Sequence, residues 1–135
     1  GLRARMLQDA AREYLEKHPR ATVINLGCGL DLSFDAIDNG SCRYINMDLP
    51  DVIEAREKIV SCKGREFNLA GDLMDFEWME RVKAEPYNVD VGEGVFIISG
   101  IIEGRQDEVR AALEQAGLRI TAHFCEEEWH CFVGI

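Results

Sequence analysis

The feature that most constrains this chain is a regular alternation of short apolar runs with helix-like segments. Apolar runs bounded by Gly or Pro are typical of buried strands, whereas apolar residues that recur every three to four positions are typical of helices. Strands are predicted over 21–26, 42–49, 65–69, 88–91, 95–102, 118–125 and 129–135. Helices are predicted over 2–17, 30–37, 51–60, 76–83 and 104–116. This order predicts an α/β fold, a Rossmann-like three-layer sandwich with a mostly parallel sheet and an antiparallel C-terminal hairpin.

One junction in this pattern is too short for the fold. Parallel neighbouring strands need a crossover of a dozen or more residues, but only Gly92, Glu93 and Gly94 separate the runs 88–91 and 95–102. We therefore expect one kinked strand, in which 88–91 or 95–99 supplies the sheet position and the glycines absorb a bend. Loss of a crossover segment is the alternative. With no repeat or linker in 135 residues, we expect one abridged domain over 1–135.

The charge of the chain disfavours several kinds of partner. Asp and Glu number 25 against 15 Lys and Arg, which gives a formal net charge of −10. Such a charge repels phosphate backbones and anionic lipids, so we expect neither nucleic acid nor a membrane as partner. No apolar run approaches the roughly 20 residues of a membrane span, and no secretory signal pattern opens the sequence. We expect an acidic cytoplasmic protein, whose oligomeric state the sequence leaves open.

The cysteines fit the same compartment. Five cysteines are an odd number, and no CxxC pair occurs among them, so a reducing environment is the simplest interpretation. Four possible metal ligands lie near the C-terminus: His123, Cys125, His130 and Cys131. Their spacing matches no zinc pattern, and alternation along two strands would place them on both faces of the sheet. We predict no metal site.

Candidate ligand-binding residues follow four successive strands. Gly27, Cys28 and Gly29 open a tight turn after the first strand, and Asp48 closes the second about 20 residues later, where a ribose diol is expected. Asp72 follows the third strand, where it could meet an adenine, and Glu93 follows the fourth. Open parallel sheets bind ligands at this edge, so the four positions together predict a nucleotide-like ligand.

Each position also has a plainer interpretation. The two glycines could form an ordinary turn, and Asp48 or Asp51 could cap the following helix. Asp72 and Asp75 could be solvated turn residues, and Glu93 a loop charge. These alternatives stay open at this point.

The motifs limit which nucleotide-like ligand fits. Leu32 stands where a dinucleotide fingerprint needs a small residue, and 135 residues leave no room for the second half of a dinucleotide fold. The Gly-Lys-Ser/Thr of a phosphate-binding loop is absent. An adenosyl group with an amino-acid tail fits better, which indicates S-adenosylmethionine or S-adenosylhomocysteine as the cofactor.

Four blocks carry a resemblance to a known family: 23–31 (VINLGCGLD), 45–59 (INMDLPDVIEAREKI), 71–82 (GDLMDFEWMERV) and 92–96 (GEGVF). With them, residues 2–95 resemble the leucine carboxyl methyltransferase-like branch of class I methyltransferases, which includes polyketide O-methyltransferases. The resemblance implies the methionine part of the cofactor at 27–29, the ribose at Asp48 and the adenine at Asp72 and Leu73. It implies Glu93 near the methyl end, as the one candidate base. The cofactor-binding residues that it implies are Asn25, Gly27, Cys28, Gly29, Asp48, Leu49, Asp72, Leu73, Glu93 and Arg5.

Beyond Val95 the chain is similar to another family. Residues 108–120 (EVRAALEQAGLRI) and 126–135 (EEEWHCFVGI) resemble the C-terminal end of ribosomal-protein lysine methyltransferases. Both families share the class I methyltransferase fold but differ in substrate, so the methyl acceptor, a small molecule or a peptide, stays open. The first resemblance favours O-methyl transfer. The main alternative is a non-catalytic, truncated or recombined domain that binds cofactor weakly or not at all, and a protein-interaction module is a third possibility.

Overall fold

A six-stranded sheet forms the centre of the molecule, with the strands in the order β3-β2-β1-β4-β6-β5. The computed structural model describes residues 2–72, 75, 77–88, 95–102, 106–115, 117, 119–126 and 129–134. The strands are β1 (Thr22–Leu26), β2 (Arg43–Asp48), β3 (Glu66–Ala70), β4 (Val95–Ile102), β5 (Ile120–Glu126) and β6 (Trp129–Gly134). β1 to β4 are parallel to one another, which confirms the predicted α/β fold with a parallel sheet.

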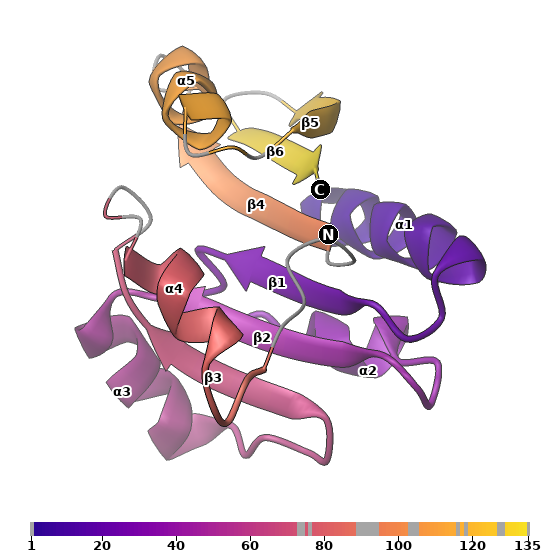
Figure 1. The fold of residues 1–135 in the computed structure, drawn as a ribbon, viewed down its shortest axis with the longest axis vertical. Coiled ribbons are helices and arrows are strands. Elements are labelled where there is room, and N and C mark those ends of the chain that lie inside the picture. Colours follow the sequence, from indigo (N-terminus) through magenta and orange to yellow (C-terminus); the bar gives the residue numbers. More distant parts are fainter. Residues whose placement is uncertain are drawn as a thin grey trace.

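At the other edge of the sheet the strand direction changes. β6 runs antiparallel to β4, and β5 runs antiparallel to β6, so the edge strand β5 has the same direction as β4. A register irregularity lies between Ile98 and Ile101, where β4 meets β6. Figure 1 shows the curvature of β4 along this stretch.

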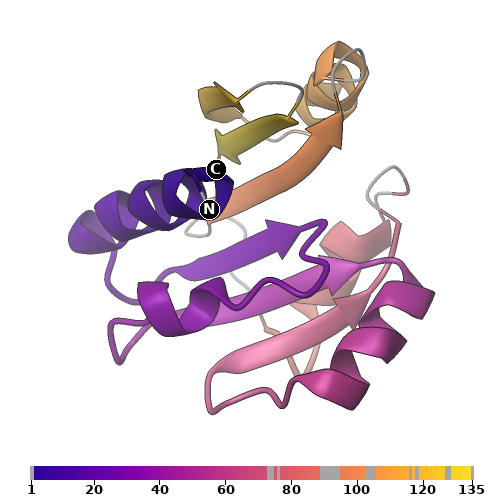
Figure 2. The same cartoon turned by 180° about the vertical axis from the view of Figure 1, so that it is seen from behind.

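Five helices of the described part cover the two faces of the sheet (Figures 1 and 2). They are α1 (Leu2–Lys17), α2 (Ser33–Ile37), α3 (Pro50–Ile59), α4 (Glu77–Lys83) and α5 (Gln106–Gln115). α2 and α3 lie on the face that Figure 2 shows from the front, and α4 lies on the opposite face. The first predicted helix agrees with α1 at both ends, whereas α2 begins three residues later than predicted, because residues 30–32 continue the loop after β1.

Alternation along the central strands divides the core in two. Ile24, Leu26, Ile45, Met47 and Leu69 pack with residues of α4 and α5. The intervening side chains of the same strands face α1 and α2, where Val23 and Tyr44 pack with apolar residues of both helices. The sheet is therefore buried on both faces, as its nearly continuous apolar strands require.

The short junction before β4 is resolved in favour of the second run. β4 pairs with β1 from Val95 onward, so Val95–Ile102 supplies the sheet position. Asn88 has a φ of 49° and lies outside any strand, so the predicted strand over 88–91 is wrong at its first residue. Residues 89–94, including Gly92 and Gly94, lie outside the described part of the chain.

One predicted core position is also wrong. The apolar periodicity of α3 placed Ile59 on the buried face with Ile53, but Ile59 is 70% exposed. α3 ends at this residue, and its side chain borders a cavity instead of the core.

Candidate functional site

Asp48 joins the three segments that follow β1, β2 and β3. Its carboxylate Oδ2 accepts a hydrogen bond from the Gly29 backbone N–H at 2.9 Å. Its backbone carbonyl accepts one from the Gly71 N–H, also at 2.9 Å, directly before Asp72. The structure therefore brings together three of the four strand ends that the sequence singled out, with Asp48 in the middle.

The capping alternative for Asp48 is not what the structure shows. Leu49 is the N-cap of α3, Pro50 follows it, and the helix has no side-chain capping hydrogen bond. The second carboxylate oxygen of Asp48 accepts the Leu49 N–H at 2.8 Å. Asp48 thus stabilises the turn before α3 while its other oxygen reaches across to the loop after β1.

The loop after β1, residues 27–31, is called the glycine loop below. Gly27 and Gly29 both have positive φ values, 78° and 52°, which non-glycine residues rarely adopt. The N–H groups of Gly27 and Cys28 both donate to the Met47 carbonyl, at 2.8 and 3.1 Å. A Cβ added at Gly29 would meet no atom within 4 Å, so open space lies beside the loop at this residue.

A chain of polar side chains supports the glycine loop, and the sequence analysis did not foresee it. Asn25, fully buried in β1, donates from Nδ2 to Asp31 Oδ2 at 3.0 Å. The Ser33 hydroxyl donates to Asp31 Oδ1 at 2.8 Å, and Gln8 Nε2 of α1 reaches the Ser33 hydroxyl at 3.4 Å. Asn25 therefore holds Asp31 from within the sheet, and its predicted contact with a ligand stays a prediction.

A second buried group lies under the same loop. Arg56 of α3 is 1% exposed and donates from Nη1 to the carbonyls of Gly29 and Asp31, at 3.2 and 2.7 Å. Its Nη2 lies 3.4 Å from Glu66 Oε2 of β3. The sequence contained a signal for this pair, because Arg56 occupies a position of the apolar stripe of α3, where a cation needs a buried partner.

The environment of Cys28 keeps its thiol protonated. Burial raises the pKa of the Cys28 thiol to about 12, against an ordinary value of 9.0, and the nearby Arg56 only partly offsets this effect. A protonated thiol is a poor nucleophile and metal ligand. Cys28 and Cys42 are free, buried cysteines, as the sequence analysis expected, whereas Cys62 is exposed.

The remaining predicted site residues are spread around this centre. Leu49 and Asp72 are exposed beside Asp48 and Gly71. Asp75 behaves as a turn residue, since its Oδ1 accepts the Glu77 N–H at the start of α4. Arg5 is exposed on α1, one turn before Gln8. Leu73 and Glu93, with the predicted role of Glu93 as a base, lie outside the described residues.

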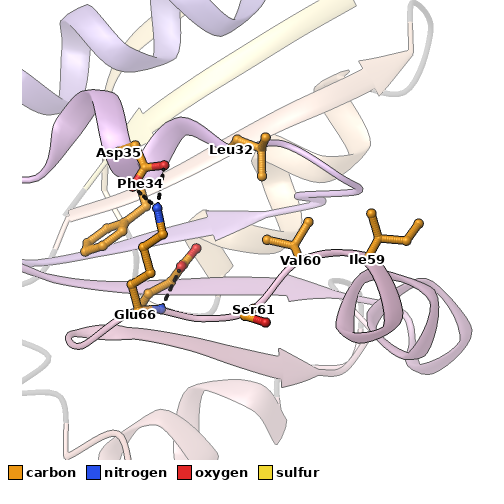
Figure 3. A pocket seen from close by; sticks show the side chains of 8 residues that line it. Leu32, Phe34, Asp35, Ile59, Val60, Ser61 and Glu66 are labelled. Atoms are coloured by element: carbon orange, nitrogen blue, oxygen red, sulfur yellow. Dashed lines mark hydrogen bonds and ion pairs between the residues drawn. The ribbon is translucent and has the colours of Figure 1, made fainter.

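A cavity of about 310 Å³ lies between α2 and the segment that joins α3 to β3 (Figure 3). Leu32, Phe34, Ile59 and Val60 supply its apolar walls, and Glu66 lines it from β3. The Lys63 ammonium lies 3.2 Å from both carboxylate oxygens of Asp35 at its border. Figure 3 shows the cavity on the α2–α3 face.

Two further features were searched for in the described residues. No group of three or more His, Cys, Asp or Glu side chains there could hold a metal ion, and the side chains of His123, Cys125, His130 and Cys131 lie outside that part. None of the described helices has the length and apolar character needed to cross a membrane.

Comparison with known proteins yields methyltransferases. A family model described as ribosomal protein L11 methyltransferase (PrmA) matches residues 76–135. TcmP, the tetracenomycin polyketide synthesis O-methyltransferase of Streptomyces glaucescens, is 31% identical over 94 residues, which cover 69% of this chain and 35% of that protein. The ribosomal protein L11 methyltransferase of Agathobacter rectalis is 28% identical over 145 residues, which cover 87% of this chain and 45% of that protein.

A solved structure gives the decisive comparison of fold. Fibrillarin of Aeropyrum pernix, crystallised with natively bound S-adenosyl-L-methionine, superposes with a TM-score of 0.56 at 11% identity and covers 98% of this chain and 76% of that chain. By fold, this chain belongs to the class I methyltransferases. The predicted family and its Rossmann-like fold are therefore confirmed.

The methyltransferase domain described here is short relative to its relatives. It spans between a third and a half of the two curated relatives named above. The alignment with the Agathobacter rectalis protein is longer than this chain of 135 residues, so that relative has residues with no counterpart here.

Proposed function

We propose that this domain binds S-adenosylmethionine across the carboxyl ends of β1, β2 and β3, and that it transfers the methyl group to an acceptor. The observation that carries the proposal is the position of Asp48, which is hydrogen-bonded to both the glycine loop and the segment after β3. A ligand at the crevice outside parallel strand ends would contact all three segments together. The cofactor-bound fibrillarin structure, with the same fold, supports this choice of ligand.

The residues at the site suit the parts of this cofactor. A carboxylate can accept about four hydrogen bonds, and Asp48 uses two in the contacts described above, so capacity remains for a ribose diol. The open space beside Gly29 leaves room for the amino-acid tail, and the exposed Leu49 offers an apolar surface to the adenine. The buried contacts of Asn25 and Arg56 hold the glycine loop without occupying that space.

The cofactor supplies an activated methyl group on a sulfonium. Alignment of the acceptor with that group then provides most of the acceleration, and a base is needed only where the acceptor must lose a proton. Glu93 is our candidate for that base. The similarity to an O-methyltransferase favours an oxygen acceptor on a small molecule, with a peptide acceptor as the second candidate.

We also propose a cytoplasmic location and no nucleic-acid or membrane partner. The free thiols of Cys28 and Cys42 support a reducing compartment. The net charge of −10 opposes binding to phosphate backbones and anionic lipids.

Binding of S-adenosylhomocysteine tests the proposal directly. Titration calorimetry with the wild-type chain should give a saturable heat, and ligand at 100 times its Kd should stabilise the fold by about 2.7 kcal/mol. Asp48→Ala should lose affinity at least tenfold. Asp51→Ala is the matched control, because Asp51 lies three residues away in the first turn of α3 and makes no capping bond.

Two outcomes would contradict the proposal. The absence of binding and of thermal stabilisation at millimolar ligand would exclude the cofactor site. Binding without methyl transfer to phenols, carboxylates or basic peptides would instead favour the non-catalytic alternative.

A further inference from the structure

We propose that Arg56 is a positioning residue, which orients the glycine loop so that the backbone N–H groups of Leu30 and Leu32 face the ligand. This inference rests on the proposed function, because it assigns the support of the same site. Arg56 is buried and touches no predicted ligand position with its side chain other than through loop carbonyls.

The contacts of Arg56 fix two peptide groups of the loop. Nη1 donates to the carbonyl oxygens of Gly29 and Asp31, which lie on either side of Leu30. A trans peptide is planar and its N–H points opposite to its C=O. Because both carbonyls point toward the buried guanidinium, the N–H groups of Leu30 and Leu32 point away from it.

Those two N–H groups are available for a ligand. Among the described residues, neither donates a hydrogen bond, whereas the intervening Asp31 N–H donates to the Cys28 carbonyl. The side chains of Leu30 and Leu32 are exposed, so this side of the loop faces outward. Two outward donors suit an anionic group such as the carboxylate of an amino-acid tail.

The partner of Arg56 keeps its charge in place. An unpaired buried guanidinium would be strongly destabilising, and Glu66 lies within ion-pair distance of it. Glu66 is itself held by Asn46 Nδ2 at 2.8 Å and by the Lys63 N–H at 3.3 Å. α3, β2 and β3 therefore all contribute to the orientation of a loop that belongs to β1.

A guanidinium suits this role better than an ammonium. Arg carries several donors in a rigid plane, so it reaches the two carbonyls and the Glu66 carboxylate together. Lys is a single charged point on a flexible stem, and in its place we expect the ion pair with Glu66 but only part of the carbonyl contacts.

The test compares Arg56→Met with Arg65→Met. Arg65 contacts the same kinds of groups as Arg56, the Asp38 carboxylate and the Cys42 carbonyl, but it follows the turn before β3 at the opposite ends of the strands. At a temperature where each variant is fully folded, we expect Arg56→Met to lower the affinity for S-adenosylhomocysteine at least tenfold and Arg65→Met less than twofold. Arg56→Lys should fall between wild type and Arg56→Met, and it serves in place of Arg56→Met if that variant does not fold.

Nuclear magnetic resonance gives a readout that does not need the ligand. In the Arg56 variants, the carbonyl carbon shifts of Gly29 and Asp31 should change as their hydrogen bonds are lost, while Arg65→Met leaves them in place. Unchanged shifts, or wild-type affinity in both Arg56 variants, would overturn the inference. Failure of the wild-type chain to bind would instead overturn the proposed function, so the two failures are distinguishable.

Discussion

The Asp48 carboxylate and the Gly29 N–H are 2.9 Å apart, although they belong to two different strand-end segments. Sequence reasoning assigned them to separate parts of a ligand, the ribose and the methionine tail. The hydrogen bond shows that they also hold each other. A ligand that binds to one residue therefore acts on the position of the other.

Removing the charge of Asp48 should loosen this link. Asp48→Asn keeps one acceptor oxygen but loses the charge-assisted bonds to the Gly29 and Leu49 N–H groups. We expect the free energy of unfolding to fall by roughly 1.5–3 kcal/mol in urea titrations and the Gly29 amide to exchange faster. Asp51→Asn should change neither quantity measurably, and equal effects of the two substitutions would contradict the prediction.

A methyl group at Gly29 should affect stability and binding separately. Gly29→Ala and Gly40→Ala both place a Cβ in open space at positive φ, 52° and 85°, so each should cost about 1–2 kcal/mol of backbone strain. Only Gly29→Ala should also weaken S-adenosylhomocysteine binding, because its methyl group enters the proposed site. Calorimetric titration of both variants checks this, and equal affinities would argue against the placement of the ligand.

The buried thiol of Cys28 should make the fold sensitive to alkaline pH. Its pKa is about 12 in the folded chain against an ordinary 9.0, so above pH 9 the unfolded chain loses a proton that the folded chain retains. The folded state then binds more protons, and the free energy of unfolding falls as pH rises, by at most about 1.4 kcal/mol per pH unit. Urea titrations of wild type and Cys28→Ala at pH 8, 9 and 10 should show a shallower loss in the variant.

Other groups require a control for that measurement. Burial also raises the pKa of Tyr44, which adds a loss of the same sign above pH 10, so the comparison ends there. Cys62→Ala removes an exposed thiol and should leave most of the wild-type slope. Identical slopes in Cys28→Ala and wild type would show that the thiol is not the source.

The two faces of the core predict opposite results for two apolar truncations. Leu69→Ala removes a side chain that is 1% exposed in β3, and it should destabilise the fold by about 2–5 kcal/mol. Ile59→Ala removes an exposed side chain at the end of α3 and should change stability by less than about 0.5 kcal/mol. Chemical denaturation of both variants decides whether Ile59 contributes to the core.

The elements of this fold could be predicted because their signals are local. The apolar stripe of residues 2–17 and the apolar run before Gly27 predicted α1 and β1 to within one residue. The strand-end positions of Gly29, Asp48 and Gly71 followed from the alternation of elements, because parallel strands end at one edge of a sheet.

The supporting contacts could not be predicted because they join distant segments. Nothing near Arg56 in the sequence indicates that Glu66 will be its partner or that its acceptors are carbonyls after β1. The Gln8–Ser33–Asp31 chain likewise depends on how α1 packs beside α2. Ile59 was misplaced for a related reason, since periodicity alone does not show where a helix reaches the border of the core.

The pairing of β1 with β4 has a consequence for how the chain is synthesised. Val23 pairs with Val95, so more than half of the chain separates the two central strands. During translation, β1 can pair with β2 on one side early, but its other edge stays open until β4 has left the ribosome. Because an open apolar strand edge promotes aggregation, we expect the nascent chain to depend on chaperones during this interval more than the finished protein does.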